Sequence, residues 1–141
     1  MANAHLFNGA KLALYMGTRL AVILRDDTPG LAFRNCWDLP GGGREGRETP
    51  LACALRECRE ELGLRVPARA IVWQRCYPAQ DGARWFFVAR MPRGMAHKIR
   101  LGEEGQRFML MSEDIFLRHP DAIPAFRGRV AAYRRWRKSR G

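Results

Sequence analysis

Residues 42–64 read G-G-R-E-G-R-E-T-P-L-A-C-A-L-R-E-C-R-E-E-L-G-L, and this stretch decides the fold. Its opening glycines have little reason to stay extended, so they predict a loop. Thr49 suits a helix N-cap, and Pro50 suits the first helical position, where its missing N–H costs nothing. Gly63 provides a left-handed stop. The stretch therefore predicts a glycine loop followed by a helix over residues 50–62.

The predicted helix has an acidic face and an apolar face. Glu57, Glu60 and Glu61 cluster at i, i+3, i+4 spacing, where like charges repel by about 0.2–0.5 kcal/mol per pair. A divalent cation would reverse the sign of that interaction, and hard oxygen ligands suit Mg²⁺ or Mn²⁺. The alternative is a solvated face paired through Arg56 and Arg59. The apolar stripe consists of Leu51, Ala54, Leu55, Cys58 and Leu62.

The full pattern resembles the signature of the Nudix hydrolases, also called the MutT family. Cys58 stands where a larger aliphatic residue is usual, but cysteine packs as a small hydrophobe. Residues 37–41, W-D-L-P-G, also look like the family's approach to this signature. The fixed positions of the Nudix box, G-x5-E-x7-R-E-U-x-E-E-x-G-U, fall on Gly42, Glu48, Arg56, Glu57, Glu60, Glu61, Gly63 and Leu64.

The resemblance implies an α/β fold, a sandwich in which a mixed β-sheet has the box helix on one side and the C-terminal helix on the other. It also implies Mg²⁺-dependent hydrolysis of a nucleoside diphosphate linked to another moiety. A nucleoside triphosphate or 8-oxo-dGTP-like substrate, cleaved to monophosphate and pyrophosphate, is the leading version. We expect Glu57, Glu60 and Glu61 to bind Mg²⁺, or Mn²⁺ in its place, with the carbonyl of Gly41 as an additional ligand. Arg56 is expected to orient carboxylates rather than to touch substrate.

One more acidic residue is expected from the polar loop E-E-G-Q that precedes residues 107–111. By resemblance, Glu104 is the better match for a metal ligand or base, and Glu103 is the fallback. The general base is left open among Glu60, Glu61 and Glu104.

Arg25 and Trp37 each have two interpretations. Arg25 follows the second expected strand near the glycine loop, where similar proteins often place a basic residue to meet phosphate. It is equally consistent with pairing to Asp26 or Asp27 at a strand end. Trp37 is expected to fill the core rather than to stack on a base, because large aromatics beside a helix usually bury their area.

The rest of the chain alternates in a way typical of strands followed by helices. A short helix is expected after Ser112, and a terminal helix over residues 123–138. The first two strands are expected to form a hairpin, as are the fourth and fifth. The expected strands cover residues 10–16, 19–24, 31–38 (a short strand ending at 37), 70–77, 83–89 and 107–111.

Length and composition fit a single domain over residues 1–141. An apolar fraction of 47% is ordinary for a globular protein. No apolar run is long enough for a membrane span, and the N-terminus lacks the pattern of a signal peptide. The four cysteines show no C-x-x-C and no zinc spacing, so we expect reduced thiols in a cytoplasmic protein.

The formal net charge of +11 concentrates toward the C-terminus, where Tyr133 and Trp136 lie among arginines. Such a helix can bind RNA, steer a polyanionic nucleotide, or simply form a solvated face. Three alternatives therefore remain: an RNA 5′-end pyrophosphohydrolase, an ADP-ribose or nucleotide-sugar pyrophosphatase, and a non-catalytic nucleotide-binding regulator. Loss of catalysis usually shows as a broken box, whereas every acid of this box is present. Substrate identity and oligomeric state stay open.

Overall fold

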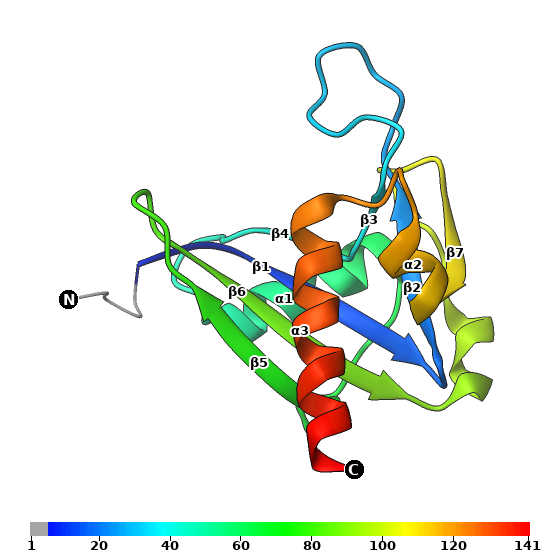
Figure 1. Ribbon diagram of the computed structural model, residues 1–141. Helices are drawn as coiled ribbons and strands as arrows, with labels where there is room; N and C mark the ends of the chain where they lie inside the picture. The colour runs from blue at the N-terminus through cyan, green and yellow to red at the C-terminus, as the bar shows by residue number, and fades with distance from the viewer. Residues whose placement is uncertain (1–5) are drawn as a thin grey trace.

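A computed structural model describes residues 6–141 and shows helices on both sides of a mixed β-sheet (Figure 1). The helices are α1 (Pro50–Leu62), α2 (Glu113–Arg118) and α3 (Pro124–Arg140), and short 3-10 turns cover Ala68–Ala70 and Arg93–Lys98. The strands are β1 (Phe7–Met16), β2 (Arg19–Leu24), β3 (Trp37–Asp38), β4 (Gly41–Gly43), β5 (Ile71–Tyr77), β6 (Ala83–Met91) and β7 (Arg107–Ser112).

The sheet has the order β3-β2-β1-β6-β5, with β4 also beside β1 and β7 also beside β2. β1 and β6 run parallel at the centre, where Leu12 pairs with Phe87. The other pairings are antiparallel, which makes the sheet mixed, as expected. The expected hairpins β1–β2 and β5–β6 are both present.

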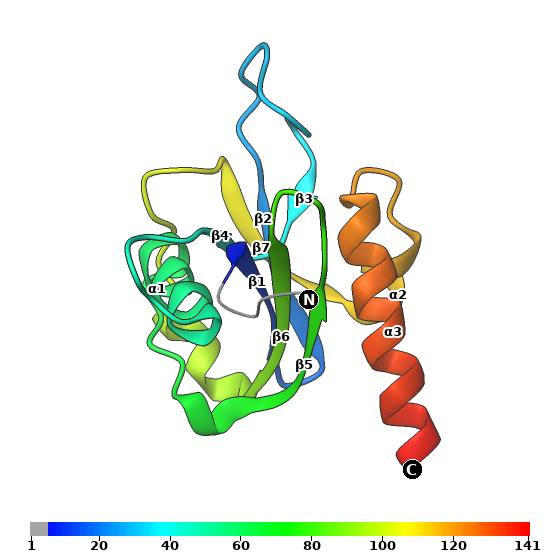
Figure 2. The same ribbon diagram turned by 90° about the vertical axis from the view of Figure 1, so that its left-hand side faces the viewer.

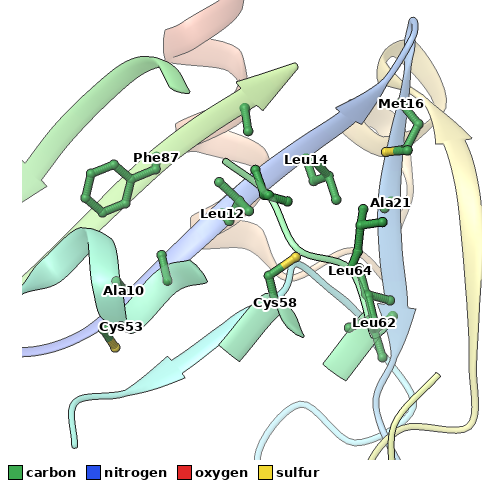
Figure 3. Packing of buried hydrophobic residues seen from close by; sticks show 14 of the residues in the cluster. Ala10, Leu12, Leu14, Met16, Ala21, Cys53, Cys58, Leu62, Leu64 and Phe87 are labelled. Atoms are coloured by element: carbon green, nitrogen blue, oxygen red, sulfur yellow. The ribbon is translucent and has the colours of Figure 1, made fainter. Parts of the chain in front are cut away.

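Helices cover the two faces of this sheet (Figure 2), and a buried apolar cluster lies on each face. α1 packs on one face, where Leu12, Cys58 and Phe87 belong to one buried cluster (Figure 3). α2 and α3 cover the other face, where Phe86 and Tyr133 belong to a second cluster. The arrangement with the box helix and the C-terminal helix on opposite sides is therefore confirmed.

α1 has the bounds that its end signals predict. The Thr49 hydroxyl accepts the N–H of Ala52 at 3.1 Å, and Pro50 occupies the first turn. Gly63 has φ of +64° and donates its N–H to the Arg59 carbonyl at 2.8 Å, which ends the helix. The expected apolar stripe lies inward, since Cys58 and its neighbours Cys53, Ala54 and Leu62 are buried.

Two expectations about loops are wrong. The glycine run is not a simple loop: Gly41–Gly43 form the short strand β4, because the backbone of β1 offers hydrogen-bonding partners alongside it. Only Trp37–Asp38 of the expected strand over 31–38 is extended. Before it the chain turns, and Phe33 and Asn35 adopt positive φ angles of 52° and 59°.

The burial of Trp37 and the state of the cysteines agree with the expectations from the sequence. Trp37 is buried, as expected for a core residue. All four cysteines are free thiols. The 3-10 turn Arg93–Lys98 lies between β6 and β7. Among residues 6–141, no helix has both the length and the apolar character needed to cross a membrane.

Candidate active site

The glycine strand β4 brings the backbone close to the acidic face of α1. A Cβ added at Gly42 would lie 2.7 Å from Oε2 of Glu57, a distance that real side chains do not tolerate. Gly42 also accepts the Cys53 thiol at 3.5 Å through its carbonyl. Glycine at this position therefore lets the Glu57 carboxylate lie directly against β4.

Arg56 collects several carboxylates around one guanidinium. Its Nη2 lies 2.7 Å from Oε1 of Glu48 and its Nε lies 3.0 Å from Oε2 of the same residue. Its Nη1 donates to Glu57 at 2.7 Å and to Glu60 at 3.1 Å. Hydrogen bonds from Arg56 lower the pKa of Glu48 to about 2. Arg56 thus offsets the like-charge repulsion that the sequence places on this helix face.

Glu61 has a different environment from its neighbours on α1. Its Oε1 accepts the backbone N–H of Gly41 at 2.7 Å, while most of its carboxyl group is withdrawn from water. Burial raises the pKa of Glu61 to about 7, although the Gly41 N–H and the charge of Lys11 act in the opposite direction. Glu61 is therefore a carboxyl group whose negative charge is incompletely balanced.

A charged cluster of Asp38, Lys11 and Arg25 lies beside β4. The Asp38 side chain is only 7% exposed and receives Lys11 Nζ at 3.1 Å and Arg25 Nη1 at 3.1 Å. Lys11 also donates to the carbonyls of Leu39 and Gly41, each at 3.1 Å. Arg25 consequently pairs with Asp38, and not with either of the neighbouring acids considered from the sequence.

These groups line one cleft of about 750 Å³, which we call the acidic cleft. The loop that carries Glu103 and Glu104 is fixed there because the N–H groups of Arg100 and Gly102 bond to the last carbonyls of α1, each at 2.8 Å. The basic residues of the cleft are Lys11 and Arg25. Its acids are Asp38, Glu45, Glu57, Glu60, Glu61, Glu103 and Glu104.

The acids share the cleft without converging on one point. Within residues 6–141, no three histidine, cysteine, aspartate or glutamate side chains are grouped so that they could hold a metal ion. The physical reason is that Arg56 engages Glu57 and Glu60, whereas the Gly41 N–H engages Glu61. The expected site residues thus lie together in one cleft, with Glu57 and Glu60 held by Arg56 and Glu61 held by the Gly41 N–H.

A second opening of about 370 Å³, which we call the apolar cleft, adjoins the first. Its apolar lining comes from Ala10, Phe33, Trp85, Ile123, Ala125 and Phe126. Its polar side chains are Asn8, Lys11, Arg25, Asp38, Arg84 and Arg129. Because Lys11, Arg25 and Asp38 line both clefts, the two openings are continuous around this charged cluster.

Sequence reasoning missed the roles of Lys11 and Asp38 in this arrangement. A usable signal existed for Lys11, which is the one charged residue in the apolar run A-K-L-A-L-Y-M of residues 10–16. Asp38 was visible only as part of the family-like approach to the box. Arg129 gave no local signal, because it is one of many arginines in the terminal helix.

The terminal helix directs its aromatic residues toward the sheet. Tyr133 is buried, and the rings of Tyr133 and Trp136 lie 5.7 Å and 6.4 Å from the ring of Trp73. Arg137 forms two hydrogen bonds of 2.9 Å with Glu113, and Arg134 also pairs with acids of α2. The interleaved aromatics are therefore part of the core, and these two arginines are already paired.

Comparison with known proteins agrees with this geometry. A family model described as NUDIX domain matches residues 13–127, whereas no match is found among curated proteins. A solved MutT protein from Methanosarcina mazei Go1 is 18% identical, with a TM-score of 0.71 and coverage of 92% of this chain and 94% of that one. An Ap4A hydrolase from C. elegans, solved as a binary complex, is 14% identical, with a TM-score of 0.71 and coverage of 93% and 98%.

A third similar structure carries bound groups. It is a bifunctional NMN adenylyltransferase/ADP ribose pyrophosphatase from Francisella tularensis, complexed with AMP and a Mn ion. The identity is 17% and the TM-score 0.60, and the match covers 76% of this chain and 34% of that one. The chain belongs to the Nudix family, whose members are pyrophosphohydrolases that generally use divalent metals such as Mg²⁺ or Mn²⁺.

Proposed function

We propose that the chain hydrolyses a nucleoside triphosphate to the monophosphate and pyrophosphate, an 8-oxo-dGTP-like nucleotide being included in that class. The observation that carries this proposal is the acidic cleft, in which the box acids face two basic residues, Lys11 and Arg25. A polyphosphate chain needs both kinds of group. Basic side chains bind its oxygens directly, and carboxylates bind the divalent ion that neutralises the remaining charge.

We assign the divalent ion, Mg²⁺ or Mn²⁺ in its place, to the carboxylates of Glu57, Glu60 and Glu61 with the Gly41 carbonyl, and Glu104 as a further candidate ligand. These carboxylates, which Arg56 and the Gly41 N–H hold apart in the structure, would have to turn toward the ion when it binds. Carboxylate and carbonyl oxygens are the ligands that these hard cations prefer. The raised pKa of Glu61, caused by burial, marks a negative charge that a cation would balance. When bound, the ion neutralises phosphate oxygens and lowers the pKa of the attacking water.

The protein's side chains position the carboxylates, bind the phosphates and accept the proton of the attacking water. Arg56 positions Glu57 and Glu60 through the hydrogen bonds already described. Arg25 and Lys11 bind phosphate oxygens from the opposite wall. The proton of the attacking water goes to a carboxylate, for which Glu60, Glu61 and Glu104 are the candidates.

The test is a hydrolysis screen with product identification, run with and without Mg²⁺. The panel holds the common nucleoside triphosphates, 8-oxo-dGTP, ADP-ribose, a dinucleoside polyphosphate and a 5′-triphosphorylated RNA. Glu61→Gln is the site variant. Asp114→Asn is the matched control, because Asp114 is 60% exposed on α2 and lines neither cleft.

The proposal expects Mg²⁺-dependent release of pyrophosphate from a triphosphate, lost in Glu61→Gln and kept in Asp114→Asn. Turnover of ADP-ribose alone, or of RNA ends alone, would replace the triphosphate with that substrate. Tight nucleotide binding without any turnover would identify a binding protein instead. Full activity of Glu61→Gln would remove Glu61 from the site.

A further inference from the structure

The apolar cleft offers a continuation of the proposed phosphate site, and the inference below rests on the proposed function. The cleft is lined by Phe126 and Phe33, and it meets the acidic cleft at Lys11. Lys11 Nζ lies 5.4 Å from the centre of the Phe126 ring. A ligand with its phosphates near Lys11 can therefore place an attached planar ring against Phe126 without leaving the protein surface.

Arg129 stands out among the polar side chains of the apolar cleft. Its guanidinium lies 4.3 Å from the centre of the Tyr77 ring and 5.4 Å from that of Phe126, and burial lowers its pKa. No hydrogen bond or ion pair links the Arg129 side chain to any residue in the range 6–141. Its guanidinium is thus held by aromatic rings, while its N–H groups have no acceptor from these residues.

The other charged side chains of this cleft and the Asn8 amide are committed to partners. Arg84 forms two hydrogen bonds, at 3.0 Å and 3.1 Å, with the carboxylate of Asp81, and Asn8 donates to the Asp81 carbonyl at 2.6 Å. Lys11 and Arg25 each pair with the carboxylate of Asp38. An unpaired, half-buried cation is costly, so Arg129 is the group in this cleft that gains most from an acceptor on a ligand.

We propose that Arg129 selects the base of the substrate, favouring a 6-oxopurine over a 6-aminopurine. A 6-oxopurine presents a carbonyl acceptor where adenine presents an amino donor, and arginine pairs with the acceptors of guanine's O6/N7 edge. On adenine the N7 acceptor remains, but the second N–H group of the guanidinium would face the 6-amino group and stay unpaired. The base packs against Phe126, and its phosphates extend toward Lys11 and Arg25.

The test compares two pairs of nucleotides that differ at purine position 6. ITP is compared with ATP, and GTP with 2,6-diaminopurine riboside triphosphate, as values of kcat/KM. We expect the wild-type protein to prefer the 6-oxo member of each pair by roughly ten- to hundredfold. In Arg129→Met that preference collapses to within about threefold, through a higher KM for the 6-oxo nucleotide with little change for ATP.

Two further variants separate base selection from folding and from general charge. Arg129→Lys keeps the charge and loses the planar pair of donors, so it retains only part of the preference. Arg135→Met removes an exposed arginine of the same helix that lines neither cleft, and it keeps the full preference. Circular dichroism shows whether each variant is folded.

Binding of IMP and AMP, measured by calorimetry, distinguishes failure of this inference from failure of the proposed hydrolysis. An Arg129-dependent preference for IMP supports the inference even if no triphosphate is cleaved. Cleavage of triphosphates with equal rates for both members of each pair overturns it and leaves the proposed function standing. A 6-oxo preference that survives in Arg129→Met also overturns it, as does a preference for ATP.

Discussion

Arg56 holds Glu48 at two points, with Nη2 2.7 Å from Oε1 and Nε 3.0 Å from Oε2. Both side chains are mostly withdrawn from water, being 15% and 14% exposed. The pair ties the loop before α1 to the middle of the helix. The Nη1 atom of the same guanidinium donates hydrogen bonds to Glu57 and Glu60. One arginine therefore positions three carboxylates of the box.

The Arg56 contacts predict that Arg56→Lys destabilises the fold by about 1.5–3 kcal/mol, because an ammonium cannot reproduce the paired hydrogen bonds. Urea unfolding measures this change. Arg59→Lys is the matched control, since Arg59 is exposed on the same helix, and it should change the unfolding free energy by less than about 0.5 kcal/mol. Equal stabilities for the two variants would contradict the role given to Arg56.

Removing the charge of Asp38 should strongly lower the stability of the folded protein, because two cations share this one carboxylate. Asp38→Asn leaves Lys11 and Arg25 facing each other without a buried anion, which costs about 3–5 kcal/mol. Thermal unfolding checks this expectation. Asp27→Asn is the comparison, because Asp27 is 58% exposed and pairs with an exposed arginine at 3.4 Å. An Asp38→Asn protein as stable as Asp27→Asn would show that the cluster contributes little.

The contact between β4 and α1 predicts a specific effect of Gly42→Ala. The added methyl group would lie 2.7 Å from Oε2 of Glu57, so that carboxylate must move. We expect Mn²⁺ affinity, measured by electron paramagnetic resonance, to fall by about tenfold or more, in line with the loss of ligand positioning at metal sites. In Gly94→Ala the new methyl group meets nothing within 4 Å, and Mn²⁺ binding should be unchanged.

Glu113 predicts a pH dependence of stability outside the cleft. Burial alone would raise its pKa, but hydrogen bonds from Arg137 and Tyr15 outweigh burial and hold the pKa below the ordinary value of 4.5. A depressed folded-state pKa stabilises the protein above the unfolded-state pKa, and this stabilisation is lost as pH falls through the folded-state pKa. The wild-type advantage over Glu113→Gln should therefore be largest near neutral pH.

Acid titration of the unfolding free energy for both proteins measures that advantage. The difference between them should shrink as the pH falls below about 4.5, the reference value for a glutamate carboxyl. A difference that stays constant from pH 7 into this acid range would mean that the Glu113 charge does not stabilise the folded state.

The sequence predicted the parts of the fold that local signals determine. Thr49, Pro50 and Gly63 set the bounds of α1, and the alternation of apolar residues placed most strands. Long-range hydrogen bonding decided the rest. The glycine run becomes β4 only because β1 lies alongside it, and the turn at Phe33 depends on φ angles that bulky residues seldom adopt.

The candidate site divides in the same way. The box acids are visible in the sequence because their spacing along one helix is fixed. Lys11, Asp38 and Arg129 come from separate elements, and their meeting depends on how β1, β3 and α3 assemble around the sheet. No spacing rule within one segment could have brought these three residues together.

The parallel pairing of β1 with β6 affects how the protein is made on the ribosome. Leu12 must find Phe87, so the centre of the sheet joins the first strand to one that is synthesised much later. Until then, α1 and its acids have emerged while the parallel partner of β1 is still missing, and closing so long a loop is slow. The nascent chain meanwhile exposes one edge of β1, where misassociation with other chains would begin.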